Sequence, residues 1–383
     1  MRLAVNTSTI TAPHTGISVY THEILSRLPF IAPDLEIFHF LGTHWQAGEL
    51  NILNDDTNGS KIISLLKERF RLVPGARTAW NLFKKKRFTF GKNTPIADIY
   101  WEPCFIPPRN LQNMVTTVHD LSHIRFPEYH PKSRLKSMES LAEVIEASQK
   151  ILTVSEYSKG EIIDVFGTPA DKIIVTHNAP ADQYKVLSEG KREPVLKKFG
   201  LMDKSYFLSV CTLEPRKNLK TILKAYNLIP RSIQEKFPLV LVGRSGWSQE
   251  KNKSFYNKLC PGGNIIFTGY VDASDLPALF GGAKSFVYPS VYEGFGLPPI
   301  EAMACGTPVI ASDIPVLREV CADVASYASV LCERQWRDRL VESLDLNQDQ
   351  YWALSARGVS RSKCFSWDSS ARKTYDVFEE VNS

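Results

Sequence analysis

Short apolar runs alternate with longer amphipathic stretches along this chain, and this alternation constrains its fold more than any other feature. In the first half, the apolar runs lie at residues 2–6, 36–40, 98–101, 114–120, 150–155 and 172–177. Helical patterns lie between several of them, for example over 20–28 and 133–147. Because strands that alternate with helices form a parallel sheet covered on both faces, the pattern predicts a doubly wound α/β domain.

The second half repeats this alternation. Its apolar runs lie at residues 206–211, 238–243, 264–269, 285–290, 308–312 and 325–329, and its helical patterns at 219–228, 275–280, 299–304, 316–320 and 334–344. Residues 186–203 contain no predicted strand, which places the domain junction near them. We therefore expect two Rossmann-like domains, at 1–190 and 191–365. A ligand would bind in the cleft between them, beyond the carboxyl ends of the strands.

The composition is that of a soluble globular protein, with 43% apolar and 23% charged residues. No apolar run approaches the ~18 residues that a membrane-spanning helix needs. The N-terminus has no signal-peptide pattern. The seven cysteines include no Cys-x-x-Cys pair, which favours reduced thiols over a disulfide framework or a zinc site. We therefore expect a cytoplasmic protein.

Residues 61–92 form a strongly basic segment. They contain ten Lys and Arg and one acid, Glu68, although the net charge of the whole chain is only +5. Apolar side chains such as Phe70 and Trp80 lie between the charges. Such a segment is typical of a surface that binds anionic lipid or phosphate, and a solvated stretch without a partner fits it equally well. Under the first interpretation, the protein is peripheral on the inner face of the cell membrane.

Glu293 and Glu301 lie in the string YPSVYEGFGLPPIEAMACGTPVI (288–310). A strand is predicted just before Glu293, and Pro298 and Pro299 suit the beginning of a helix whose first turn contains Glu301. The loop glycines permit close approach of the backbone to a ligand, and a helix N-terminus offers N–H groups to an anion. The segment could therefore bind sugar hydroxyls and phosphate. The alternative is one loop acid and one helix-dipole acid without a ligand.

Three further strand ends have polar or glycine residues. Arg216 and Lys217 follow the strand at 206–211, where a guanidinium beside an ammonium suits phosphate oxygens. His119 follows a strand end as well, and its imidazole can donate a hydrogen bond or take a proton. Gly16 lies between the first strand and the first helix, where backbone amides can meet a phosphate. The alternatives are exposed turns and a structural histidine.

Several chemistries have no motif in this chain. It contains no Asp-x-Asp pair that could clamp a metal-bound diphosphate, and no HExxH, GxSxG or GxxxxGK[ST] string. We therefore expect no metal requirement, no separate cofactor and no serine nucleophile. Strings that combine aromatic and basic residues, as in RNA-binding modules, are absent too, so no nucleic-acid partner is expected.

Together these segments resemble the retaining, nucleotide-sugar-dependent glycosyltransferases of family four, which have the GT-B fold. The resemblance extends over nearly the whole chain, and its strings are VHDLSHIRFPEYHP (118–131), TVSEYSKGEI (153–162), LEPRKN (213–218), LVGRSGW (241–247) and the string 288–310. It also implies that FSWDSSARKTYDVF (365–378) belongs to a final helix, in 366–383, that crosses back onto the N-terminal domain.

The resemblance implies roles for residues of the donor site. Arg216 and Lys217 would bind the donor diphosphate and stabilise the charge of the leaving group. Glu301 would hold the nucleotide ribose, and Val271 would lie near the base. Gly16 would let the first loop approach the donor phosphate and the acceptor.

The remaining candidates would surround the transferred sugar. Glu293 would contact its hydroxyls, and His119 would contact it near the reacting carbon. The other donor-binding or cleft positions that the resemblance implies are Gly294, Phe295, Gly296, Leu297, Ser155 and Lys159. The chain departs from many relatives at Thr15-Gly16, where they have two glycines, and at Asn178-Ala179, where they have Asn-Gly.

Within the family, the strings 14–21 and 118–131 are most similar to mannosyltransferases that use GDP-mannose to build bacterial surface polysaccharide of the O-antigen type. The acceptor would then be a growing glycan on a lipid diphosphate, with residues 61–92 at the membrane. Three alternatives stay open: a UDP-sugar-dependent glycosyltransferase of the same fold, a sugar-nucleotide epimerase, and a non-enzymatic protein that binds through the basic segment.

Overall fold

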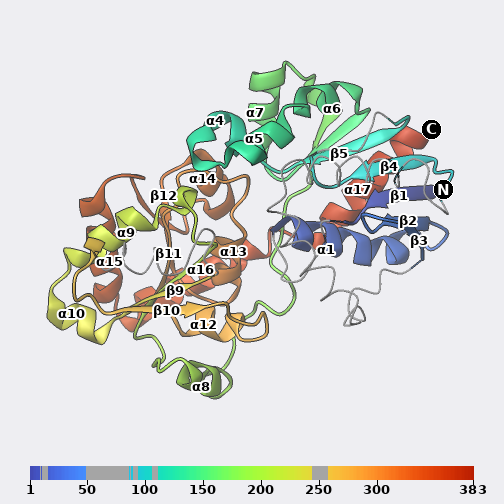
Figure 1. The fold of residues 1–383 in the computed structure, drawn as a ribbon. Coiled ribbons are helices and arrows are strands. Elements are labelled where there is room, and N and C mark those ends of the chain that lie inside the picture. The colour runs from blue at the N-terminus through green and yellow to red at the C-terminus, as the bar shows by residue number, and fades with distance from the viewer. Residues whose placement is uncertain are drawn as a thin grey trace.

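The computed structural model describes residues 1–8, 10, 16–48, 86, 88, 94–105, 111–243 and 258–383. These residues form two α/β halves, each built around its own sheet (Figure 1). The basic segment 61–92 lies outside the described residues except for Lys86 and Phe88, and Thr15 and residues 244–247 lie outside them too.

The N-terminal half contains a seven-stranded sheet in the order β3-β2-β1-β4-β5-β6-β7. Its strands are β1 (Arg2–Asn6), β2 (Glu36–Phe40), β3 (Trp45–Ala47), β4 (Ile99–Glu102), β5 (Met114–Val118), β6 (Lys150–Thr153) and β7 (Ile173–Val175). Its helices are α1 (Gly16–Ile31), α4 (Ser122–Arg125), α5 (Lys132–Met138), α6 (Leu141–Ala147) and α7 (Glu156–Phe166). All strand pairs are parallel except β2 and β3, and the six predicted strands are confirmed.

The C-terminal half contains a six-stranded parallel sheet in the order β10-β9-β8-β11-β12-β13. Its strands are β8 (Phe207–Val210), β9 (Leu239–Val242), β10 (Ile265–Gly269), β11 (Ser285–Tyr288), β12 (Val309–Ser312) and β13 (Ser326–Ala328). Its helices are α8 (Glu189–Lys198), α9 (Leu219–Asn227), α10 (Arg231–Lys236), α12 (Leu276–Gly282), α13 (Leu297–Ala304), α14 (Pro315–Cys321), α15 (Glu333–Asp345) and α16 (Gln348–Ser362). The two-domain α/β prediction is confirmed.

Burial on both faces explains why the central strands are almost continuously apolar. Every residue of β5, β9 and β11 is buried, as helices on both sides of a parallel sheet require. The covering helices are amphipathic: α9 buries Leu219, Ile222, Leu223 and Tyr226, which share one helical face.

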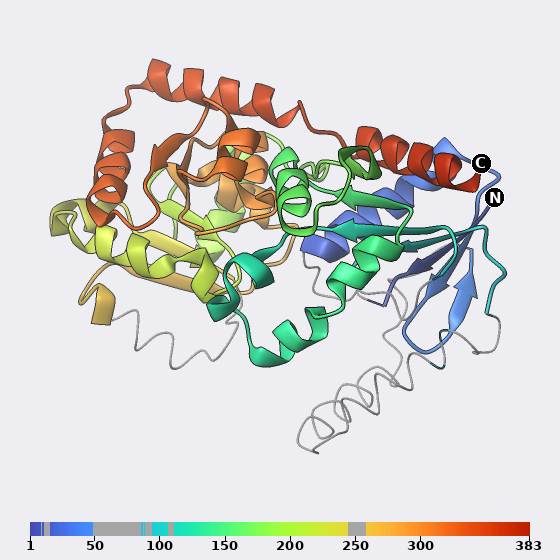
Figure 2. The ribbon, with the colours of Figure 1, turned by 90° about the horizontal axis from the view of Figure 1, so that it is seen from above.

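The chain returns to its beginning through α17 (Trp367–Asn382), which packs against α1 in the N-terminal half (Figure 2). The indole of Trp367 and the ring of Tyr20 have centroids 6.0 Å apart. Arg27 of α1 donates a 2.6 Å hydrogen bond to Asp368. The expected helix that crosses back onto the N-terminal domain is therefore present.

The helical pattern over 133–147 is not one helix. It divides into α5 and α6, because α6 buries Leu141, Val144 and Ile145 while α5 buries only Met138. The edge strand β3 was not predicted, since three residues are too few to show a strand period. Trp45 holds it in place by donating a hydrogen bond from Nε1 to the carbonyl of Phe88 at 3.1 Å.

Candidate active site

A cleft of about 720 Å³ lies between the two halves. Residues from both halves line it, and they come from strand ends, from loops and from the first turns of helices. The structure brings together in its wall the following predicted residues: Gly16, His119, Arg216, Lys217, Val271, Glu293, Gly294, Phe295, Gly296, Leu297 and Glu301.

The strand order explains this convergence. In the C-terminal sheet the chain order reverses between β8 and β11, which pair in parallel through Phe207–Ser285 and Leu208–Phe286. The loop after β8 contains Arg216 and Lys217, and the loop after β11 contains Glu293. Where the strand order reverses, the loops on the two sides extend in opposite directions. They leave a crevice at the carboxyl edge of the sheet.

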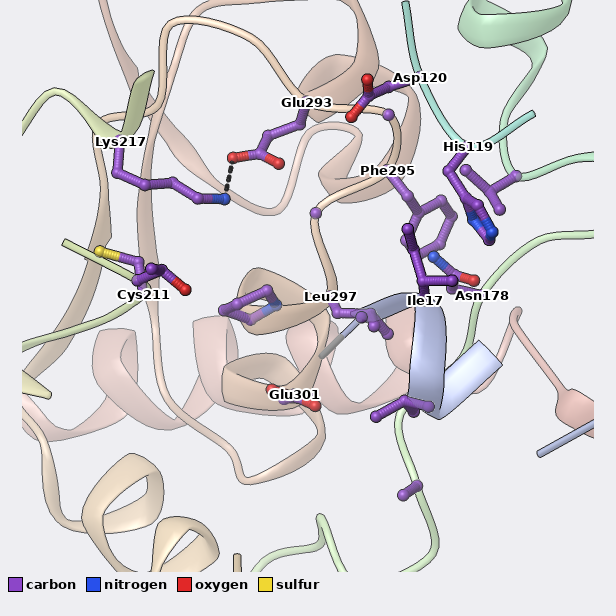
Figure 3. A pocket seen from close by; sticks show the side chains of 18 of the residues that line it. Ile17, His119, Asp120, Asn178, Cys211, Lys217, Glu293, Phe295, Leu297 and Glu301 are labelled. Atoms are coloured by element: carbon purple, nitrogen blue, oxygen red, sulfur yellow. Dashed lines mark hydrogen bonds and ion pairs between the residues drawn. The ribbon is translucent and has the colours of Figure 1, made fainter. Parts of the chain in front are cut away.

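Glu293 is the centre of a buried charge network. Its Oε1 accepts hydrogen bonds from Lys217 Nζ at 2.5 Å and from the Tyr288 hydroxyl at 2.8 Å. Its Oε2 accepts one from Arg216 at 3.1 Å. Burial opposes ionisation of this carboxyl group, but the two cations outweigh it and lower its pKa to about 2. Figure 3 shows the Lys217–Glu293 pair at one side of the cleft.

Arg216 is fixed on several sides. One amino group donates to the carbonyl of Tyr292 at 2.7 Å and the other to Glu214 at 2.9 Å. Burial lowers the pKa of this guanidinium, but Glu293, Asp120 and Glu214 outweigh burial and raise it above its ordinary value. Arg216 therefore stays charged and cannot rotate freely, which suits a preorganised anion site.

The loop between Glu293 and α13 is the second anion-binding feature. Gly296 has a φ of 103°, which favours glycine. The backbone N–H groups of residues 294–297 donate no hydrogen bond to any residue that the structure describes. The first turn of α13 offers fewer free amides to an anion than expected, because Pro298 and Pro299 occupy it and have no N–H. The loop, more than the first turn of α13, offers donors to an anion.

Glu301 and Val271 lie on another part of the cleft wall. Glu301 is half-buried on α13, and burial raises the pKa of its carboxyl group to about 7, although a hydrogen bond with Tyr184 opposes this rise. Figure 3 shows it below Leu297, away from the Lys217–Glu293 pair. A carboxylate at one end and two cations at the other match a ribose and a diphosphate.

His119 faces the cleft from the N-terminal half. Its Nε2–H donates to the carbonyl of Pro103 at 2.8 Å. Burial lowers the pKa of the imidazole, so the ring is neutral at pH 7. Because Nε2 has the proton, Nδ1 is the acceptor of this ring. The ring packs edge-on to Tyr20 and Phe105, with centroid distances of 5.0 Å and 5.7 Å.

Ser155 and Lys159 do not line the cleft, contrary to expectation. Ser155 is buried behind it and caps α7, while its hydroxyl donates to the carbonyl of Gly294 at 2.6 Å. The Lys159 ammonium donates a 2.9 Å hydrogen bond to the carbonyl of Ile173 and does not reach the cleft. Ser155 precedes α7 and Lys159 lies in it, and the first turn of this helix contacts Glu319 of the other half instead of the open space.

Other residues of the cleft wall were not among the predicted site residues, and Asp120 and Asn178 are two examples. Asp120 follows His119 and lies close to Arg216 of the opposite half. Asn178 is 7% exposed, and its Oδ1 has no hydrogen-bond partner among the described residues. Asn178 follows β7, so the rule that placed His119 at a strand end would have found it.

Two structural features are absent from the residues that the structure describes. No three His, Cys, Asp or Glu side chains are grouped as a metal ion would require. None of the described helices has the length and apolar character needed to cross a membrane.

Comparisons with known proteins place the chain in a family. The sequence profile described as "Glycosyl transferases group 1" matches residues 191–347. The chain is 36% identical to O-antigen chain mannosyltransferase B of Escherichia coli, over 99% of this chain and 100% of that protein. It is 30% identical to serotype-specific mannosyltransferase WbdA of Escherichia coli, over 72% of this chain and 34% of that longer protein.

A solved structure shows the same fold at low sequence identity. Sucrose-phosphate synthase from Thermosynechococcus elongatus superposes with a TM-score of 0.71 at 16% identity, covering 100% of this chain and 99% of that one. The two parallel sheets and the cleft between them are thus those of a GT-B fold. With a relative matched from end to end, this chain belongs to the group 1 glycosyltransferases.

Proposed function

We propose that this protein transfers mannose from GDP-mannose, with retention of configuration, to a lipid-linked glycan in O-antigen-type polysaccharide synthesis. The observation that supports this most is the 36% identity, across the full length, to an O-antigen chain mannosyltransferase. The cleft supports it chemically, because Arg216 and Lys217 lie together at one side and Glu301 elsewhere along the same wall.

The proposed mechanism begins with the charge on the leaving group. Breaking the bond between the anomeric carbon and the phosphate oxygen leaves negative charge on the diphosphate. Arg216, Lys217 and the free amides of residues 294–297 would stabilise that charge without a metal ion. Glu293 would then contact the hydroxyls of the sugar while it holds the two cations in place.

Retention follows if the acceptor attacks from the face that the diphosphate leaves. The new bond joins the acceptor oxygen to the anomeric carbon, and the acceptor proton passes to the departing phosphate oxygen. Glu293 is a poor base for this step, because its neighbours lower its pKa to about 2. The neutral His119 would accept a hydrogen bond from the sugar through Nδ1. Closure of the two halves would exclude water and limit hydrolysis of the donor.

Membrane association is the third element of the proposal. The basic residues 61–92 would attract an anionic cytoplasmic membrane surface, at ~1 kcal/mol for each basic residue near it. Flotation with vesicles should therefore require anionic lipid and weaken with salt. Binding to neutral vesicles that salt does not weaken would contradict this anchor.

The function is tested by incubating the purified protein with GDP-mannose, UDP-glucose or UDP-N-acetylglucosamine, each with octyl α-mannoside as acceptor. We expect a mannosylated product with an α-anomeric bond from GDP-mannose only, and equal rates with and without EDTA. Transfer from a UDP-sugar alone would refute the donor assignment. Conversion of the nucleotide sugar to an epimer without acceptor would refute glycosyl transfer.

A further inference from the structure

The loop that leads to Glu293 has one side chain that is buried against the opposite half. Tyr292 belongs to the C-terminal half, where it follows β11, and it is 3% exposed. Its ring packs against those of Phe126 and Tyr157 of the N-terminal half, with centroid distances of 5.4 Å and 6.1 Å. Tyr292 does not line the cleft, so contact with a substrate does not explain its burial.

Two groups of the N-terminal half hold the Tyr292 hydroxyl. The amide of Leu121 donates to it at 3.0 Å, and the hydroxyl in turn donates to Glu161 Oε2. Burial raises the pKa of Tyr292, and the carboxylates of Asp120 and Glu161 raise it further, so the hydroxyl keeps its proton. The hydroxyl therefore accepts one hydrogen bond and donates another, and both of its partners belong to the opposite half.

Glu161 is itself fixed within the N-terminal half. It is 6% exposed on α7, and its Oε1 accepts hydrogen bonds from Arg125 at 2.9 Å and from the Tyr157 hydroxyl at 3.2 Å. Arg125 also pairs with Asp164, one turn further along α7. The N-terminal half therefore positions the carboxylate that receives the Tyr292 hydroxyl.

The main chain of Tyr292 connects this anchor to the donor site. Its carbonyl accepts a 2.7 Å hydrogen bond from Arg216 Nη1, and the same nitrogen donates to Glu293 Oε2 at 3.1 Å. The amide of the preceding residue donates to the Arg216 carbonyl at 2.9 Å. The loop therefore holds both the backbone and the side chain of Arg216.

This arrangement leaves one edge of the Arg216 guanidinium for a ligand. Nη1 donates to Tyr292 and Glu293, Nη2 donates once to Glu214, and no described residue accepts from Nε. Nε and Nη2 therefore each have an N–H group for phosphate oxygens, which a planar guanidinium presents in one direction only. A shift of the Tyr292 carbonyl would turn this edge away from the diphosphate.

We propose that Tyr292 is a positioning residue that makes the orientation of Arg216 depend on the N-terminal half. Docking of the two halves supplies Leu121 and Glu161 to its hydroxyl, and the anchored loop orients Arg216 toward the departing diphosphate. Separation of the halves would break both hydrogen bonds of the hydroxyl and remove the fixed geometry on which charge stabilisation depends. The assignment rests on the proposed function, because it concerns the leaving group of that reaction.

The test is a double-mutant cycle between Tyr292→Phe and Arg216→Ala. The assay is GDP release from GDP-mannose with octyl α-mannoside as acceptor. Tyr292→Phe keeps the ring but removes the hydroxyl, and it should lower kcat roughly tenfold. In the Arg216→Ala background the same change should lower kcat by less than about twofold, because no guanidinium is left to position. A tyrosine that only joined the halves would lower kcat by the same factor in both backgrounds.

Two matched controls come from the same cluster. Tyr157→Phe removes the other hydroxyl that donates to Glu161, and Asp164→Ala removes the other carboxylate that pairs with Arg125. Neither change removes a hydrogen bond of Tyr292, so kcat should stay within about twofold of the natural protein. Glu161→Ala removes the acceptor of the Tyr292 hydroxyl and should reproduce the loss in Tyr292→Phe. Thermal unfolding of each variant reports whether it is folded.

Other results would overturn the assignment in distinguishable ways. A kcat of Tyr292→Phe equal to that of Tyr157→Phe refutes the positioning role. So does an equal loss with and without Arg216, which would make Tyr292 a structural contact only. If the natural protein turns over no nucleotide sugar, the proposed function fails instead. Calorimetric binding of inorganic pyrophosphate then decides on the anchor: Tyr292→Phe should weaken it roughly threefold or more, and an unchanged affinity refutes the assignment.

Discussion

Replacing Lys217 with alanine tests whether the cation pair stabilises the departing diphosphate. The Lys217 side chain is 12% exposed, so its charge acts in a partly desolvated site. Two unit charges ~4 Å apart at an effective dielectric constant of ~20 interact by about 4 kcal/mol. Part of that interaction already exists in the bound donor, and only the increase on bond breaking lowers the barrier. Loss of one preorganised donor therefore costs about 3 kcal/mol, or roughly a 100-fold decrease in kcat.

The fold should survive this change, because Glu293 keeps its hydrogen bonds with Arg216 and Tyr288. The assay is the release of GDP at saturating donor and acceptor, with thermal unfolding recorded on the same samples. Lys220→Ala is the matched control, since Lys220 is exposed on α9 and does not line the cleft. A folded Lys217→Ala protein whose kcat stays within threefold of the control would refute the reasoning.

Three other perturbations follow from the geometry. An alanine at Gly294 would place its Cβ 2.0 Å from the carbonyl oxygen of His119, so the two halves must separate. We expect at least a roughly tenfold loss of transfer activity. The control Gly160→Ala, whose added Cβ meets nothing within 4 Å, should lose no activity, and equal activities of the two variants would contradict this prediction. Burial raises the pKa of Glu301 to about 7, so the carboxylate that accepts ribose hydroxyls predominates only above that pH. The donor KM should therefore fall roughly tenfold from pH 6 to pH 8. In the Glu301→Gln variant the donor KM should not change with pH. Glu319 accepts 2.8 Å hydrogen bonds from two amides at the beginning of α7 in the other half, and so joins the two halves. Glu319→Ala should raise the donor KM roughly threefold or more and enlarge the radius of gyration in X-ray scattering. An unchanged radius of gyration would show that Glu319 does not hold the halves together.

Most of the fold could be predicted from local patterns. A continuous apolar run such as β9 indicates a strand that is buried on both faces, and this pattern can be recognised from neighbouring residues alone. Elements that depend on distant contacts could not be predicted. The helical pattern over 133–147 divides because only α6 covers the sheet, and β3 exists because Trp45 packs against a residue far along the chain.

The candidate site divides in the same way. A single strand end was enough to select His119, Arg216, Lys217 and Glu293, since ligands bind beyond the carboxyl ends of parallel strands. Ser155 and Lys159 were placed at the cleft only by resemblance, and their hydrogen bonds to backbone carbonyls show that they face elsewhere. No sequence pattern indicates which side a helix turns toward its neighbour.

By itself, then, the sequence determined the two α/β halves and the residue types that end their strands, because strand periodicity and turn residues are local properties of the chain. The tertiary structure alone decided that Glu293 lies between Arg216 and Lys217, and that Asp120 of one half faces Arg216 of the other. These contacts join residues between 76 and 96 positions apart in the chain. They depend on the reversal of strand order and on the docking of the two sheets, which no local pattern specifies.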